Sequence, residues 1–145
     1  MLSNEDIFNI CKAKNIKLDD ILCKNELQNK KDGNYIINLS SSRDDGTHWT
    51  ACVKNNDENF YFDSFGIIAP TEVENFLNND YTYNDKQIQN YYDEHCGFYC
   101  IAFLCSMDMT KDKLHNMESF LNLFQDDGHA VNLHILENFI KEYIS

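Results

Sequence analysis

Apolar residues in the first part of the chain recur at helical spacing. After Ser3, a residue type that favours the N-cap position, Ile7, Ile10 and Cys11 fall three and four positions apart, with acidic residues in the first turn. This pattern predicts a helix over residues 4–14. The following segment, LDDILCKNELQ, predicts a second, shorter helix over residues 18–28.

The pattern then changes to short runs rich in residues that favour strands. Residues 34–40 read NYIINLS and residues 47–53 read THWTACV. A third run, NFYFDSFG at 59–66, follows the turn-like KNNDE. The three runs predict adjacent strands, and the last two are expected to form a hairpin.

Helical spacing returns after the third run. Pro70 and Thr71 open an amphipathic pattern within residues 69–79, which predicts a helix with the proline in its first turn. A short strand is expected at residues 80–85. Further on, the nearly continuous apolar run from Phe98 to Cys105 has the length of a buried helix.

The C-terminal part carries two more helical patterns. Residues 113–125 and 131–144 place apolar side chains three and four positions apart, and residues 125–129 read as the loop between them. The chain is thus expected to form a single α+β domain over residues 1–145, with a central antiparallel or mixed β-sheet flanked by helices.

Composition narrows the classes of function. A chain of 145 residues with 43% hydrophobic residues is long enough to bury a packed core. Its net charge of −12 disfavours broad contact with nucleic acid. No apolar run approaches the roughly 20 residues of a membrane span. The N-terminus carries acids where a signal peptide carries bases, so we expect an unexported protein whose six cysteines are free thiols.

Three of the cysteines lie in the segment YYDEHCGFYCIAFLCSM, residues 91–107, where a thiol can be a buried structural group, a metal ligand or a nucleophile. Cys100 and Cys105, inside the apolar run, fit buried thiols. A zinc site lacks a second close-spaced pair of ligands, so no metal is expected. Cys96 differs, because Gly97 follows it at the start of a helix, where free backbone N–H groups and the helix dipole stabilise a thiolate.

A nucleophilic thiolate needs a base, and His48 in GTHWTACV offers one on a predicted strand. The plainer interpretation of His48 is a hydrogen-bonded histidine within the sheet. Asp63 lies between aromatic residues on the neighbouring strand, where a carboxylate needs a partner such as an imidazole. Gln89 lies seven residues before Cys96 and could donate to an oxyanion, although by itself it reads as a surface glutamine.

Four separated elements follow one another in the sequence: THW, YFDSFG, a glutamine, and CGFYCIAFL, whose cysteine lies seven residues after the glutamine. Together they resemble the cysteine proteases of the adenain and ubiquitin-like-protein protease superfamily, over residues 34–107. The likeness is closest to adenovirus-type maturation proteases, including those of virophages, large DNA viruses and virus-like transposons. It implies a papain-like or adenain-like cysteine proteinase fold, with the nucleophile at the N-terminus of a buried central helix.

The resemblance also implies a role for each residue of the pattern. His48 is expected to be the general base, Asp63 the acid that orients it, Cys96 the nucleophile and Gln89 an oxyanion donor. Trp49 and Gly97 are expected to contact the substrate. Asp93 and Glu94, just before the nucleophile, are expected to face solvent or to cap the helix.

The function implied by the resemblance is a thiol endopeptidase that cleaves Gly-containing sites in capsid and other virion precursor proteins. We expect a monomer without a cofactor, present in the host-cell cytoplasm, in the viral factory, and in the virion. The resemblance allows for an activating viral peptide, but the acidic charge gives no basis for activation by DNA.

Two alternatives stay open. Asp63 stands where adenovirus protease has Glu, and the cellular branch that removes ubiquitin-like modifiers shares the Asp, so a deconjugating protease is the first. A catalytically silent binding module with the protease fold is the second.

Overall fold

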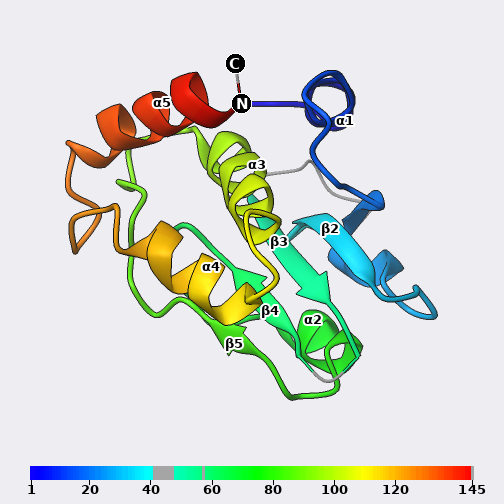
Figure 1. Cartoon of the computed structure of the whole chain (residues 1–145). Coiled ribbons are helices and arrows are strands. Elements are labelled where there is room, and N and C mark those ends of the chain that lie inside the picture. Colours follow the sequence, from blue (N-terminus) through cyan, green and yellow to red (C-terminus); the bar gives the residue numbers. More distant parts are fainter. Residues whose placement is uncertain (41–47, 57, 145) are drawn as a thin grey trace.

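The computed structural model describes residues 1–40, 48–56 and 58–144 (Figure 1). At its centre is a five-stranded sheet in the order β1-β2-β3-β4-β5. The strands β2, β3 and β4 pair antiparallel, whereas β1 pairs with β2 and β5 pairs with β4 in parallel, so the sheet is mixed. The strands are β1 Asp20–Cys23, β2 Gly33–Asn38, β3 Trp49–Lys54, β4 Phe60–Phe62 and β5 Thr82–Tyr83.

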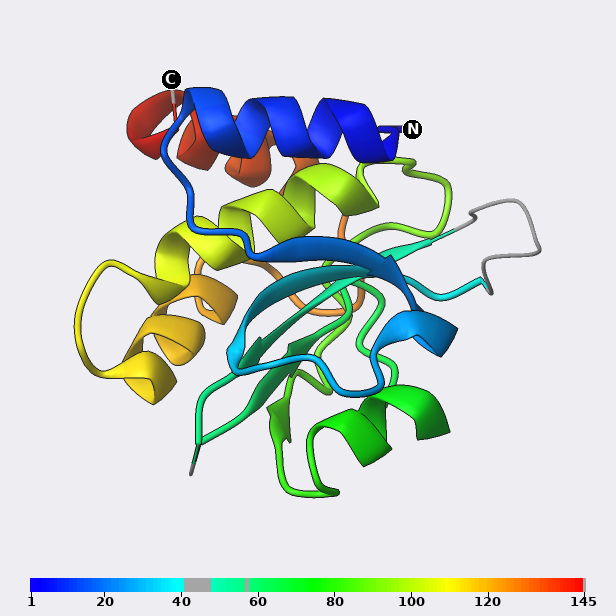
Figure 2. The same ribbon diagram turned by 90° about the vertical axis from the view of Figure 1, so that its right-hand side faces the viewer.

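Helices cover both faces of this sheet (Figure 2). Helix α3 lies between the sheet and the two terminal helices α1 and α5, and α2 lies on the opposite face. The helices are α1 Asn4–Ala13, α2 Thr71–Phe76, α3 Cys96–Met107, α4 Lys113–Leu121 and α5 Asn132–Tyr143, with a 3-10 turn, η1, at Lys24–Glu26. This arrangement confirms the α+β class.

Alternation along the strands divides the apolar residues between two cores, because successive side chains of a strand point to opposite faces. Ile36, Ala51 and Phe62 belong to the larger core, which includes α3 and residues from α1, α4 and α5. Tyr35 and Tyr61 belong to the smaller core, beneath α2. Both faces of the central strands are therefore buried.

Helix α3 is the buried central helix that the apolar run predicted. All its residues except Phe98 and Cys105 are buried, and the Phe103 ring stacks on Phe62 of β4 with centroids 4.7 Å apart. A helix that is apolar all round must be enclosed by other elements. Cys96 is its first residue and so lies at the N-terminus of the central helix.

The predicted helix over residues 18–28 is wrong. Residues 20–23 form β1, which pairs with Tyr35–Asn38 of β2, and only the 3-10 turn η1 follows it. The Asp19 carboxylate accepts the backbone N–H of Asn34 at 2.7 Å and holds the start of this pairing. The hydrogen bonds of β1 go to a distant segment, and local spacing does not reveal such a partner.

The other predicted elements are confirmed, with shifted ends. Strand β4 stops at Phe62, because the chain turns after Asp63 and the Gly66 N–H donates to the Asp63 carbonyl at 2.7 Å. Pro70 is the N-cap of α2 and not part of its first turn. Position 47 of the second predicted strand lies outside the described residues. Within the described ranges, no helix is long and apolar enough to cross a membrane.

Candidate active site

His48 and Asp63 are brought together by the hairpin of β3 and β4. His48 directly precedes β3 and Asp63 directly follows β4, and the antiparallel register places these two strand ends side by side. His48 Nε2 lies 2.8 Å from Asp63 Oδ1. The Asp63 side chain is only 1% exposed, so the imidazole partners a carboxylate that is almost removed from water.

Cys96 joins this pair from the first turn of α3, which packs against β3. Burial lowers the pKa of His48, but hydrogen bonds to Asp63 and Cys96 and the negative charges of both outweigh it and raise the pKa to about 9 from the ordinary 6.5. Because Nε2 faces Asp63, Nδ1 is the nitrogen left for the thiol. The imidazole thus lies between carboxylate and sulfur.

Asp63 is held by its backbone as well as by its side chain. The buried Asn84 accepts the Asp63 N–H at 3.1 Å and donates its amide to the Asp63 carbonyl at 2.6 Å. The Phe65 N–H donates to Oδ1 at 2.8 Å, and Oδ1 is also the atom that contacts His48. These contacts fix where the carboxylate points before any substrate binds.

An aromatic stack covers the imidazole. The Phe65 ring lies nearly parallel to the His48 ring, with centroids 4.6 Å apart. The Tyr91 ring follows at 5.1 Å from Phe65 and is largely exposed. Phe65 therefore restricts rotation of the His48 side chain and shields it from water, while its own backbone holds Asp63.

Gln89 is buried and firmly placed, contrary to the plainer interpretation of a surface glutamine. Its Oε1 accepts the Ser64 hydroxyl at 2.5 Å, and its Nε2 donates to the Asp93 carbonyl at 2.6 Å. The backbone N–H groups of Ile88 and Gln89 both donate to the Ser64 carbonyl. A primary amide has two N–H donors, and the second donor of Gln89 has no partner among the described residues.

Gly66 makes the close approach of the Gln89 segment possible. Its φ is +74°, and a Cβ on it would lie 2.8 Å from the backbone nitrogen of Gln87. A side chain there would push this segment away from the Asp63–Phe65 turn, and with it the glutamine.

Trp49 and Gly97, the two expected substrate contacts, lie beneath the N-terminal residues. The indole N–H of Trp49 donates to the Leu2 carbonyl at 3.0 Å, and the ring is 3% exposed. A Cβ on Gly97 would lie 3.1 Å from the Leu2 side chain and 3.4 Å from the indole. Leu2 thus packs against both residues, and their contact with substrate stays a prediction.

Of the two acids before Cys96, Glu94 faces solvent as expected, but Asp93 neither faces solvent nor caps α3, because its side chain is only 8% exposed and pairs with the His95 ring. Asp93 accepts the backbone N–H of His95 at 2.7 Å and also contacts the His95 ring, while Glu94 is exposed. His95 is the N-cap of α3 and makes no side-chain capping hydrogen bond there. Asp93 therefore braces the turn that leads into the helix.

The sequence interpretation missed the residues that support the pattern, namely Ser64, Phe65, Asn84 and Tyr91. Ser64 and Phe65 directly follow Asp63 in FDSFG, so proximity to a candidate acid was a usable signal. Tyr91 lies between Gln89 and Cys96, so the same signal applied to it. Asn84 meets the site only through the fold, and nothing in its local sequence indicates it.

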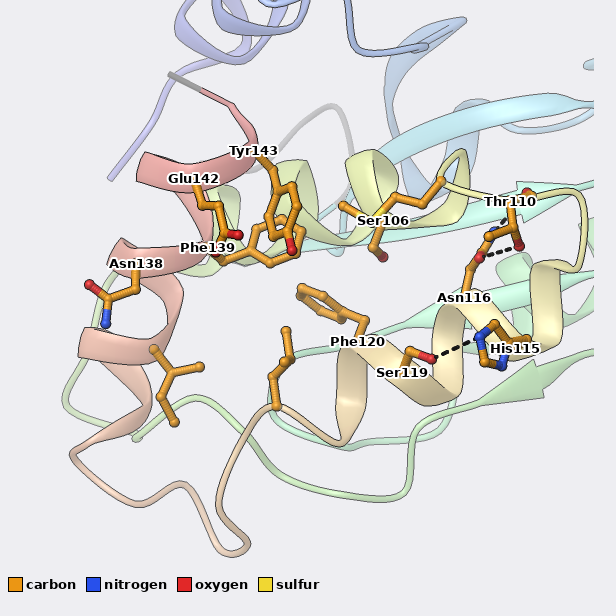
Figure 3. A pocket seen from close by; sticks show the side chains of 13 residues that line it. Ser106, Thr110, His115, Asn116, Ser119, Phe120, Asn138, Phe139, Glu142 and Tyr143 are labelled. Carbon is orange, nitrogen blue, oxygen red and sulfur yellow. Dashed lines mark hydrogen bonds between the residues drawn. The ribbon is translucent and has the colours of Figure 1, made fainter.

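A separate cavity of about 360 Å³ lies between α4 and α5 (Figure 3). Phe139 and Tyr143 of α5 face Phe120 of α4 across it, and the Phe120 and Phe139 rings are 5.4 Å apart. Its lining does not include His48, Asp63, Gln89 or Cys96. In the described part of the chain, no three His, Cys, Asp or Glu side chains gather as a metal site would require.

The sequence matches no known protein-family model and no curated protein. A thiol beside an imidazole that favours its protonated form, with a buried carboxylate behind the imidazole, can form a thiolate–imidazolium pair. With an amide donor held nearby, such a set is suited to attack on a carbonyl carbon.

Proposed function

We propose that this protein is a cysteine endopeptidase with Cys96 as nucleophile, His48 as general base and acid, and Asp63 as the acid that orients His48. The observation that carries the proposal is the position of the His48 ring, whose Nε2 lies 2.8 Å from Asp63 Oδ1. Burial lowers the pKa of His48, but Asp63 and Cys96 together raise it to about 9. The α+β architecture, with the thiol at the start of the buried α3, supports a papain-like, adenain-like fold.

The proposed reaction begins with the Cys96 thiolate, formed when the thiol proton moves to His48. The thiolate attacks the carbonyl carbon of a peptide bond, and the free Gln89 amide N–H and the backbone N–H of Cys96 stabilise the oxyanion. The His48 imidazolium then protonates the leaving amine, which leaves a thioester on Cys96. Water, deprotonated by His48, hydrolyses the thioester and restores the thiol.

The fixed partners of each group support this assignment. Asp63 holds one nitrogen of His48, so the ring presents its other nitrogen to the sulfur. Ser64 fixes the orientation of the Gln89 amide by donating to its oxygen, which keeps the nitrogen available as a donor. Positioned groups of this kind lower a barrier without reorganisation during the reaction.

We further propose that the substrates are virion precursor polypeptides, capsid proteins among them, cleaved at Gly-containing sites. This part of the proposal follows from the resemblance of residues 34–107 to adenovirus-type maturation proteases. The host-cell cytoplasm and the virion are the corresponding locations.

The test is cleavage of Gly-containing peptides and of a co-expressed capsid precursor by the wild-type chain and by Cys96→Ala. We expect cleavage by the wild type, no cleavage by the variant, and the same circular dichroism spectrum for both. A thiol-directed inhibitor should label Cys96 at neutral pH. Full activity of Cys96→Ala would overturn the proposal.

Asp63, the acid shared with the cellular branch, favours deconjugation of ubiquitin-like modifiers as the second candidate function. A folded modifier with a Gly-Gly tail, offered beside the capsid-precursor peptide, separates the two activities. Turnover of the modifier alone would favour deconjugation. Absence of both activities and of thiol labelling would favour a silent binding module.

A further inference from the structure

A hollow opens on the turn that leads into the nucleophile helix. A cavity of about 580 Å³ is lined by Asp93, Glu94, His95 and Tyr99, and on its far side by Leu133 of α5. A second cavity of about 220 Å³ shares His95 and Leu133 with the first and continues over α5 to Glu137 and Ile140. The two cavities together are called the His95 groove here.

The His95 groove adjoins the proposed site through two connections. His95 is the residue before Cys96, and it lines both cavities. The carbonyl of Asp93, at the groove wall, accepts the Gln89 amide at 2.6 Å. The groove therefore begins at the residue next to Cys96, although Cys96 itself is not part of either lining.

When the histidines of the groove are neutral, every charged side chain that lines it is negative at neutral pH. Glu94 and Glu137 supply two exposed carboxylates, and Asp93 supplies a third that is largely buried and already paired with the His95 ring. Among the described residues neither lining includes a lysine or an arginine. Phe98, Leu133 and Ile140 supply an apolar floor. A long side chain with an apolar stem and a cationic end matches this combination.

Tyr99 supplies an independent indication of a polar ligand. Its side chain is fully buried and lines the larger cavity, and its hydroxyl has no hydrogen-bond partner among the described residues. Burial, with a smaller contribution from the charge of Asp93, raises the pKa of Tyr99, so the hydroxyl stays neutral and can accept a hydrogen bond. Buried hydroxyls normally have a partner, and a cationic N–H would be one.

We propose that the His95 groove binds a lysine or arginine side chain of the polypeptide substrate, close to the scissile bond. The charged end would lie between the carboxylates of Asp93 and Glu94 and the Tyr99 hydroxyl, and its stem along the apolar floor. The identification of this ligand as part of a substrate rests on the proposed protease function; the preference for a basic side chain does not.

Binding to the full chain carrying Cys96→Ala, which cannot turn substrate over, tests the preference directly. The probes are fluorescein-labelled peptides with a Gly-Gly centre that differ at one flanking position, where they carry lysine, norleucine or glutamate. Fluorescence anisotropy should show a position at which lysine binds about five- to tenfold more tightly than norleucine, as a charged hydrogen bond would provide. The advantage should decrease as salt is added.

Variants test whether the preference for lysine over norleucine arises in the groove. Glu94→Gln with Glu137→Gln should remove most of the preference, and Tyr99→Phe should reduce it without changing charge. The control, Glu118→Gln with Glu142→Gln, changes the net charge equally but lies outside the groove lining, and it should keep the preference. A thermal melt of each variant verifies folding.

Equal or undetectable binding of the peptides at every position would overturn the proposal, as would an equal loss in the control pair. Cleavage of the same peptides by the wild type separates the two proposals. Cleavage without a basic preference would retain the protease and reject the groove. A basic preference in binding, with no cleavage by the wild type, would retain the groove and reject the protease.

Discussion

Two cysteines one turn apart on α3 have different surroundings. Cys100 is fully buried, and burial raises the pKa of its thiol well above the ordinary value. Cys96 is also buried, but it lies beside His48, whose pKa of about 9 it helps to raise against the effect of burial. The difference lies in the partner, because an imidazolium can stabilise a thiolate that an apolar core cannot.

The surroundings of the first turn of α3 are set by elements far away in the sequence. The hairpin of β3 and β4 brings His48 and Asp63 to this turn, whereas Cys100 in the second turn is buried in the packed core. Variants that change one turn and spare the other therefore test whether the two thiols differ in reactivity.

The largest effect on activity is expected from removing the Cys96 thiol, and the matched variant removes the Cys100 thiol. Cys96→Ala should lower kcat/KM at least ~10⁴-fold, because the nucleophile is lost. Cys100→Ala should retain nearly full activity and lose about 1–2 kcal/mol of unfolding free energy, since it leaves a small cavity. Peptide cleavage and urea unfolding measure both. Equal losses of activity in the two variants would contradict the contrast between the turns.

Asp63→Asn should have the next largest effect, about 10³-fold on kcat. The variant keeps the shape of the side chain but removes the charge that raises the pKa of His48. In the wild type the imidazolium persists until the pH rises through about 9, and activity should fall above that value.

In Asp63→Asn the fall should begin at lower pH, and a pH–rate profile measures the change. The exposed Asp126 offers a control, since Asp126→Asn should leave the profile unchanged. An unshifted alkaline limb in Asp63→Asn would argue that another group controls it.

Gln89→Ala should lower kcat about 10²-fold, with a smaller change in KM, because it removes a donor to the oxyanion. Gln89 is buried, so unfolding must be measured beside the kinetics. Ser64→Ala is the matched variant, since it keeps the amide but frees its oxygen. A rise in KM alone in Gln89→Ala would assign the side chain to substrate binding instead.

The smallest effect is expected from Phe65→Leu, a loss of about five- to tenfold in kcat. Leucine keeps an apolar cover but not the parallel stacking on His48, so the ring is held less firmly. A positioning role also predicts a shift of the alkaline limb, which a loss of stability alone would not produce. Tyr91→Leu, one ring further from His48, should have less effect than Phe65→Leu.

The order of the central elements could be predicted because their patterns are local. The residues that favour strands in NYIINLS and THWTACV, and the apolar run of α3, place β2, β3 and α3 correctly. Segment 18–28 could not be predicted in this way, because β1 depends on parallel pairing with β2. Helical propensity is a weak preference that such pairing overrides.

The candidate site, too, could be predicted only in part from local sequence. His48, Asp63 and Cys96 are chemically distinctive and were predicted individually, but their contact with one another is a property of the fold. The cover over Trp49 could not be predicted, since the Leu2 carbonyl that binds its indole is 47 residues away. Every residue has a backbone carbonyl, so the sequence does not indicate which carbonyl accepts a hydrogen bond from a given side chain.

The most direct test is an NMR titration of the His48 imidazole in the wild-type chain and in Cys96→Ala. If Asp63, His48 and Cys96 act together, the His48 ring should titrate with a pKa of about 9 in the wild type and at a lower pH in Cys96→Ala, where the sulfur no longer favours the imidazolium. A pKa near the ordinary 6.5 in both proteins would show that the three groups do not act together.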